Sequence, residues 1–175
     1  MDADVKALAA RLQRLEDLEA IRTTWRDYAI RLDAFDLTRL ADVFTEDAVL
    51  EVDGLNTLGG QADGPYRGRA AIIGDFYGKV ADMPALAVRG AHSTGHIATN
   101  MQIELAGDEA TTLGYFFEIV ANDLVLIGAY QHRMRRDPDR WRIAFKRIAV
   151  RYKARLQVSE VSGQSLPAVL AKPRP

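Results

Sequence analysis

The order of the periodic segments is what most restricts the fold of this chain, because helical patterns come first and strand patterns follow. Apolar residues between Leu18 and Leu32 recur every three or four positions, which predicts a helix over about residues 4–34, broken at most once. A second, short helix is expected from Asp36, a suitable N-cap, to Phe44. Residues 48–53 then favour a strand, and residues 54–64, with four glycines, favour a flexible loop suited to a lid.

The second half of the chain is dominated by strand patterns. A third helix is expected over residues 69–80 and ends at Met83-Pro84, because proline disfavours its continuation. Short turn sequences separate the strands that follow, so these strands should be antiparallel neighbours. The four expected strands are residues 96–105, 110–121, 124–136 and 141–152. This order predicts an α+β fold in which a strongly curved sheet covers the helices and leaves a pocket between them.

Size and composition predict one domain and exclude several classes of protein. With 175 residues, the chain fits a single domain over residues 1–155, followed by a tail over residues 156–175 that is rich in Ser and Pro. A formal net charge of -1 gives no global attraction to nucleic acid or to an anionic membrane. No signal peptide and no long apolar run is seen, so a cytoplasmic protein is expected. The absence of cysteine excludes disulfides and thiolate metal ligands.

Asp33 is the first candidate for chemistry. It lies about 40° from Ala29 on a helical wheel and so borders the buried stripe, where a partly desolvated carboxylate is a stronger base for removing a proton from carbon. A helix-terminal hydrogen bond is the alternative role. Tyr28 points inward with Trp25 and is either a core aromatic or a hydrogen-bond donor to a ligand. Because Tyr28 and Asp33 differ by about 140° on an ideal helix, they share a pocket only if the helix end distorts or the pocket is wide.

His96 begins the first of the four strands, and its alternation leaves two interpretations. Its same-parity neighbours include Asn100 and are largely polar, so this face is either solvated or, if it is concave, lines a cavity in which His96 transfers protons. His92 and His132 are less clearly placed. The three histidines lack the spacing of a metal site, so neither a metal nor a cofactor is expected.

The last strand changes its alternation along its length. Trp141 and Phe145 share one parity and Ile148 the other, so a β-bulge is expected near Lys146-Arg147, with Arg147 aimed into the concave face. Residues 133–155 hold ten Lys or Arg, but alternation scatters them over both faces and no nucleic-acid motif accompanies them. A solvated, ion-paired surface is therefore expected rather than a nucleic-acid site.

Several ordered motifs resemble the SnoaL-like branch of the nuclear-transport-factor-2-like superfamily, over about residues 15–155. They are Tyr28-x4-Asp33, Leu40-Ala41-x-x-Phe44-Thr45-Glu46-Asp47-Ala48, Gly68-Arg69-x-Ala71-Ile72, His96-x3-Asn100, Gly128-x-Tyr130 and Trp141-Arg142-Ile143. Within that branch the chain is most similar to the group of scytalone dehydratase, bile-acid 7α-dehydratase and hexachlorocyclohexane dehydrochlorinase. The stretch Gly-His-Ile-Ala-Thr-Asn, residues 95–100, resembles the corresponding strand of the dehydrochlorinase.

The resemblance implies a cone-shaped fold and an Asp33–His96 dyad that removes a proton from the substrate, with Tyr28 in the Tyr-x4-Asp pattern of the bile-acid enzyme. It also implies an arginine near the end of the penultimate strand, either Arg136 or Arg135. The second tyrosine and second histidine of scytalone dehydratase have no secure counterparts here. The expected function is a cofactor-independent lyase or isomerase of the dehydratase kind. Its small hydrophobic, even polycyclic, substrate would contact Trp25, Phe44 and Phe76.

A second class of function is a non-catalytic ligand-binding or assembly module, since the same fold serves as the small subunit of ring-hydroxylating dioxygenases. The outer face of the sheet should also need covering, because Leu113, Tyr115, Phe117 and Ile119 share one parity of their strand. A homodimer or homotrimer is therefore expected, with no membrane or nucleic-acid partner.

Overall fold

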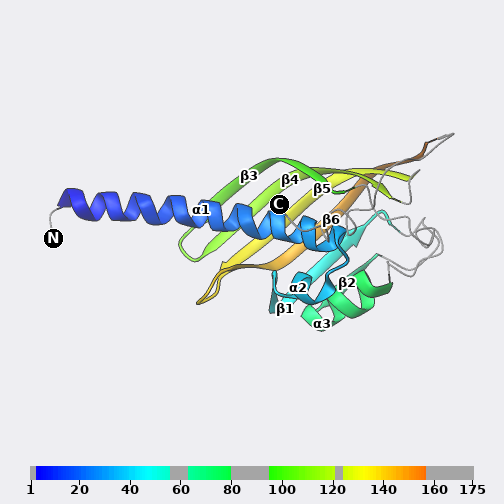
Figure 1. The fold of residues 1–175 in the computed structure, drawn as a ribbon, viewed down its shortest axis with the longest axis horizontal. Helices are drawn as coiled ribbons and strands as arrows, with labels where there is room; N and C mark the ends of the chain where they lie inside the picture. The colour runs from blue at the N-terminus through cyan, green and yellow to red at the C-terminus, as the bar shows by residue number, and fades with distance from the viewer. Residues whose placement is uncertain (1–2, 56–62, 80–94, 121–123, 157–175) are drawn as a thin grey trace, which may run out of the picture.

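Helix α1, Ala3–Asp33, is the longest element of the fold. The computed structural model describes residues 3–55, 63–79, 95–120 and 124–156. The helix is unbroken, and its buried side chains lie between its middle, at Asp17, and its C-terminal end, at Asp33. Its first four turns extend past the sheet and leave Val5, Leu8 and Leu12 exposed (Figure 1). Within the described residues, no helix is both long and apolar enough to span a membrane.

The two shorter helical segments agree with the sequence in position. Helix α2, Leu37–Ala41, begins after the N-cap Asp36, whose carboxylate accepts a hydrogen bond from the backbone N–H of Arg39. Helix α3, Arg69–Ala71, continues into the π-helix η2, Ile72–Gly78, where the sequence predicted one ordinary helix. The predicted lid loop lies largely outside the described residues, as does the tail beyond residue 156.

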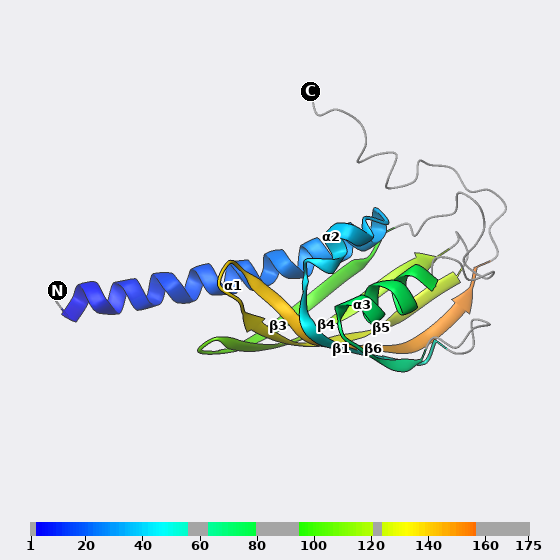
Figure 2. The same ribbon diagram turned by 90° about the horizontal axis from the view of Figure 1, so that it is seen from below.

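In the described part of the chain, six strands form one curved, open, mixed sheet with the order β2-β1-β6-β5-β4-β3. All neighbours are antiparallel except β1 and β6, which are parallel. Figure 2 shows the helices on one face of this sheet, so the α+β class with a curved sheet around helices is confirmed. The strands are β1 Phe44–Asp53, β2 Gly64–Arg67, β3 Ile97–Ala106, β4 Glu109–Val120, β5 Leu124–Arg136 and β6 Trp141–Arg155.

A β-bulge in β3 determines which of its residues face the helices. The pairing with β4 shifts between Thr99 and Gln102, and Asn100 has a positive φ of 55°. The extra residue reverses the alternation. Ala98 therefore pairs with the buried Phe116, and Ile103 pairs with the buried Thr112. The expectation of one polar face through Asn100 is wrong, because Asn100 is exposed at the bulge itself.

A second bulge lies in β6, at Ala144 rather than near Lys146-Arg147. Ile143 pairs with Met134, but Phe145 pairs with Arg133, which leaves Ala144 as the extra residue. The reversal brings Lys146 to the inner face, fully buried, and leaves Arg147 exposed on the outer face. The expectation that Arg147 points into the concave face is therefore wrong. Its guanidinium lies 3.4 Å from the carboxylate of Asp53.

Candidate functional site

Asp33 and His96 are bonded to each other in the fold. Asp33 is the last residue of α1, and one of its carboxylate oxygens accepts the backbone N–H of His96 at 2.9 Å. The other oxygen lies 2.5 Å from Nδ1 of the His96 ring. Gly95, with a φ of 112°, precedes the histidine, and a Cβ there would lie 3.6 Å from the Asp33 carboxylate. The positive φ, which glycine adopts at no steric cost, lets the chain turn beside the carboxylate.

Glu118 completes a group of three that we call the acid–histidine–acid triad: Asp33, His96 and Glu118. Nε2 of His96 lies 3.1 Å from a carboxylate oxygen of Glu118, which projects inward from β4. The side chains of Asp33 and His96 are 6% and 5% exposed and that of Glu118 is 12% exposed. Both ring nitrogens therefore contact a carboxylate in a nearly water-free setting.

The two carboxylates keep His96 charged. Desolvation by itself lowers the pKa of His96, but the charge of Glu118 and the hydrogen bonds to Asp33 and Glu118 outweigh it and raise the pKa to about 10. At neutral pH the ring is an imidazolium with a proton on each nitrogen. The triad therefore offers a proton donor, His96, beside a proton acceptor, Glu118.

Three buried tyrosines lie beside the triad. The Tyr28 ring stands edge-on to the His96 ring at a centroid distance of 6.4 Å. The Tyr77 hydroxyl donates to the Tyr28 hydroxyl at 3.1 Å, and the Tyr130 ring stands edge-on to the Tyr28 ring at a centroid distance of 5.8 Å. Burial raises the pKa of all three phenols well above the usual value, so they remain protonated donors. His96, the residue before β3, contacts both Asp33 and Tyr28, so the two helix residues belong to one site despite their angle on the helix.

The aromatic residues expected to line the site are all buried. Phe44 stands edge-on to Tyr28 at 6.4 Å, and Phe76 packs against Tyr77 at 4.8 Å, so both belong to the aromatic wall around the tyrosines. Trp25 instead contacts Tyr130 at 6.1 Å and donates its indole N–H to Nδ1 of His132.

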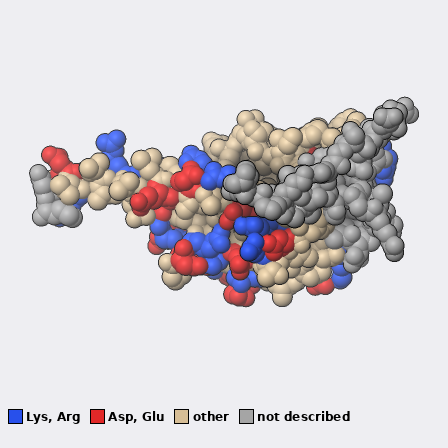
Figure 3. Space-filling view, in the orientation of Figure 1, with Lys and Arg blue, Asp and Glu red and all other residues tan. Residues whose placement is uncertain are grey.

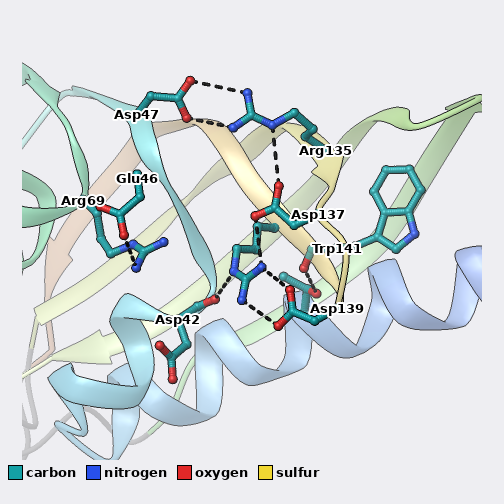
Figure 4. A network of polar contacts seen from close by, with 10 residues as sticks. Asp42, Glu46, Asp47, Arg69, Arg135, Asp137, Asp139 and Trp141 are labelled. Carbon is teal, nitrogen blue, oxygen red and sulfur yellow. Dashed lines mark hydrogen bonds and ion pairs between the residues drawn. The ribbon is translucent and has the colours of Figure 1, made fainter.

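The two alternative arginines lie away from the triad. Arg136 binds Asp17, which precedes Asp33 by about 24 Å of helix axis at about 1.5 Å per residue. Arg135 is half-exposed and lies between Asp47, at 2.9 Å, and Asp137, at 3.7 Å (Figure 4). Neither side chain lines the triad, because both are held by carboxylates of other elements.

Among the described residues, Glu118, Tyr77, His132 and Lys146 are inward-facing polar side chains to which the sequence patterns gave no role in the site. A signal for Glu118 existed, since the residues expected on the outer face of its strand, Leu113, Tyr115, Phe117 and Ile119, are all odd-numbered. The even-numbered Glu118 is then left on the inner face. An acid on the buried face of a strand is rarely there without a partner.

The charged surface agrees with the expected ion-paired character. Arg142 binds both Asp137 and Asp139, and Arg140 binds Asp27. Figure 3 shows acidic and basic side chains interspersed on one face, with no large area of a single sign.

The fold and the buried triad define a class: an α+β cone with an acid–base site between its helices and its sheet. The chain belongs to the family of SnoaL-like domains, whose model matches residues 13–147. No match was found among curated proteins.

Solved structures with this fold include a nuclear-transport-factor-2-like protein with a cystatin-like fold from Novosphingobium aromaticivorans. It is 25% identical, with 98% of this chain and 99% of that chain covered and a TM-score of 0.68. A hexachlorocyclohexane dehydrochlorinase from Novosphingobium barchaimii is 20% identical, with 87% and 99% covered and a TM-score of 0.68. A candidate scytalone dehydratase from N. aromaticivorans is 19% identical, with 83% and 91% covered and a TM-score of 0.64.

Proposed function

We propose that this protein is a cofactor-independent lyase or isomerase of the dehydratase kind that acts on a small hydrophobic, even polycyclic, substrate. The observation that carries the proposal is the buried triad, in which one imidazolium contacts two carboxylates. A paired acid and base of this kind suits removal of a proton from carbon together with protonation of a leaving group. The named activities of the dehydrochlorinase and the candidate dehydratase agree with this reaction class.

In the proposed reaction, the second oxygen of the Glu118 carboxylate takes a proton from the carbon next to an activating group. The electron pair of that C–H bond forms a C=C bond as the neighbouring C–O bond breaks. The departing hydroxide takes the Nε2 proton of His96 and leaves as water. Glu118 and His96 are then both neutral. The proton passes from Glu118 to Nε2 of His96 across their 3.1 Å contact, which regenerates the carboxylate and the imidazolium.

Asp33 and Tyr28 support these steps. The Asp33 carboxylate fixes the ring of His96 and stabilises its charge, and the Tyr28 hydroxyl donates a hydrogen bond to a developing oxyanion. This mechanism changes the role expected for His96 from base to acid, because a histidine with a pKa of about 10 already carries its proton.

Glu118→Gln tests the proposal. The amide keeps the shape of the side chain but accepts no proton, so turnover should fall by about 10²–10⁴-fold. The assay is loss of water from an aryl β-hydroxyketone, loss of chloride from hexachlorocyclohexane, or uptake of deuterium by the ketone in D₂O. Glu109→Gln, at an exposed acid of the same strand, is the matched control. Wild-type protein inert in all three assays would contradict the lyase or isomerase, and unchanged turnover by Glu118→Gln would contradict the role of Glu118.

The proposed enzyme is also expected to be a homodimer or homotrimer. Ile97, Phe117, Ile127 and Tyr152 form a continuous row across β3, β4, β5 and β6 on the outer face, and three of them are 38–60% exposed. Light scattering should therefore give two or three times the mass of one chain at micromolar concentration. Ile127→Asp should lower that mass, and Thr111→Asp, at an exposed polar position of the same face, should not. A wild-type monomer would be the contrary result.

A further inference from the structure

Lys146 is a buried basic residue that the proposed mechanism does not use. It lies on the inner face of β6 with no exposed surface. Its Nζ lies 3.5 Å from the centroid of the Tyr130 ring and 3.8 Å from that of Tyr28. No carboxylate of the described residues forms an ion pair with it. A lysine in such a place is either a cation held by two aromatic faces or an uncharged amine.

The hydrogen bonds of His132 distinguish these two states. The indole N–H of Trp25 is a donor only, so Nδ1 of His132, its partner, must accept. The Thr112 hydroxyl, 2.9 Å from the same Nδ1, also suits a nitrogen that bears no proton. A neutral histidine of this tautomer carries its proton on Nε2.

That Nε2 lies 2.9 Å from Nζ of Lys146. An ammonium group has three donors and no acceptor, so it would place a hydrogen against the Nε2 hydrogen. An amine instead has one lone pair, which accepts from Nε2, and two N–H groups, which match the two tyrosine rings. The lone pair and the two N–H groups of the amine thus each have one partner: Nε2 of His132 and the rings of Tyr28 and Tyr130. Desolvation lowers the pKa of Lys146 well below its usual value and therefore also favours the uncharged amine.

We infer that Lys146 is an uncharged amine at neutral pH and that it is a positioning residue for Tyr28. The amine contacts one face of the Tyr28 ring, while His96 lies 6.4 Å from the ring, centroid to centroid. The contacts Trp25–His132–Lys146 thereby run from α1 through β5 and β6 back to Tyr28, which lies three residues beyond Trp25 on the same helix and beside the triad. The positioning role rests on the proposed function, whereas the charge state does not.

Protonation linkage gives the first test. The groups that face Nζ are Tyr28 from α1 and Tyr130 and His132 from β5, with Glu118 of β4 acting on Tyr130. Below the unfolded pKa of 10.5 the unfolded chain binds a proton at Lys146 that the folded chain does not bind. Stability should therefore rise with pH in this window, by a tenfold fall in the unfolding equilibrium constant per pH unit.

The measurement compares wild type with Lys146→Met in urea between pH 7.5 and 9.5. The ratio of their unfolding constants, wild type over variant, should fall tenfold per pH unit, since titration of His96 is common to both and cancels. Lys79→Met, which removes an exposed lysine bound to Asp75, should not reproduce this slope. A ratio that does not change with pH would mean that Lys146 is charged in the fold and would overturn the inference.

Charge-conserving substitution gives a second test. Lys146→Arg installs a permanent cation. If Lys146 is uncharged in the fold, the Lys146→Arg variant should be less stable than the Lys146→Met variant. If Lys146 is a cation held by the two tyrosine rings, Lys146→Arg should be the more stable of the two. Should neither variant fold, the ¹³Cε signal of Lys146 in wild type at pH 7.5 remains decisive. A neutral-amine shift, with a cationic shift at Lys79, supports the inference, and a cationic shift at Lys146 overturns it.

The positioning role has its own readout in the elimination assay. Lys146→Met should lower kcat with little change in KM, and it should add no further loss in a Tyr28→Phe background, because it acts through Tyr28. Additive losses would overturn the positioning role. They would leave the proposed lyase intact, since Glu118→Gln tests that separately.

Discussion

Turnover by the Asp33→Asn and His96→Ala variants is expected to fall by about 10²–10⁴-fold each while both variants stay folded. The amide that Asp33→Asn introduces can still accept the backbone N–H of His96, but it has no charge to stabilise an imidazolium, so His96 loses a partner for its proton. The His96→Ala substitution removes the proton donor. It also removes the group to which Glu118 returns its proton after each turnover.

The comparison needs a control for the loss of an acid from the same helix. Asp4→Asn, in the exposed first turn of α1, removes a carboxylate far from the triad and should retain wild-type turnover. Circular dichroism and urea unfolding would show whether each variant keeps its fold. Normal turnover by folded Asp33→Asn and His96→Ala proteins would exclude the triad from the chemistry.

The pH dependence of stability is expected to change sharply when His96 is removed. Its folded pKa of about 10 lies above the ordinary 6.5, so the imidazolium stabilises the fold fully below pH 6.5. This contribution, on the order of a few kcal/mol, is lost as the pH rises through 10. The advantage of wild type over His96→Ala, measured by urea unfolding, should therefore shrink between pH 7 and pH 10. An advantage that stays constant over this range would contradict a raised pKa.

His96 and Lys146 should act in opposite directions on wild-type stability in this range. The histidine binds its proton more tightly in the fold, and the lysine binds its proton less tightly. A nearly flat profile for wild type is thus compatible with two strongly shifted groups. The contribution of each group to the change of stability with pH is seen only when His96→Ala and Lys146→Met are each compared with wild type.

Much of the fold follows from periodicity in the sequence. The long first helix, the N-cap at Asp36 and the four consecutive antiparallel strands all lie where the apolar spacing and turn residues predict them. Strand β2, Gly64–Arg67, was not predicted, and the expected loop over residues 54–64 ended at its first residue. Four residues at a sheet edge that begin with Gly-Pro carry no alternation to detect.

Which side chains of a strand face the helices was harder to predict than where the strand lies in the sequence. A single extra residue at Asn100 or at Ala144 reverses the side chains that follow it as far as the next irregularity of the strand, and alternation alone places such a bulge only approximately. The β3 bulge reconciles an inward His96 with an inward Ile103. The β6 bulge exchanges the expected Arg147 for Lys146 as the basic residue inside.

The triad was predicted in part. Asp33 and His96 were identified from the edge of a helical stripe and from resemblance, but the chemistry of His96 depends on Glu118, which is 22 positions further along the chain. The register of β3 against β4 brings the beginning of one strand close to the end of the other. The sequence carries no direct signal that both ring nitrogens of His96 contact a carboxylate. For this reason the sequence suggested that His96 is a base, whereas its contacts favour an acid.

The ¹⁵N resonances of the His96 ring, followed from pH 6 to pH 11, test the central claim most directly. The triad predicts that both nitrogens are protonated at pH 8 and titrate near pH 10, and that Glu118→Gln lowers this pKa because it removes the charge that raises it most. A His96 ring that is neutral at pH 8, with a pKa near 6.5, would contradict the account.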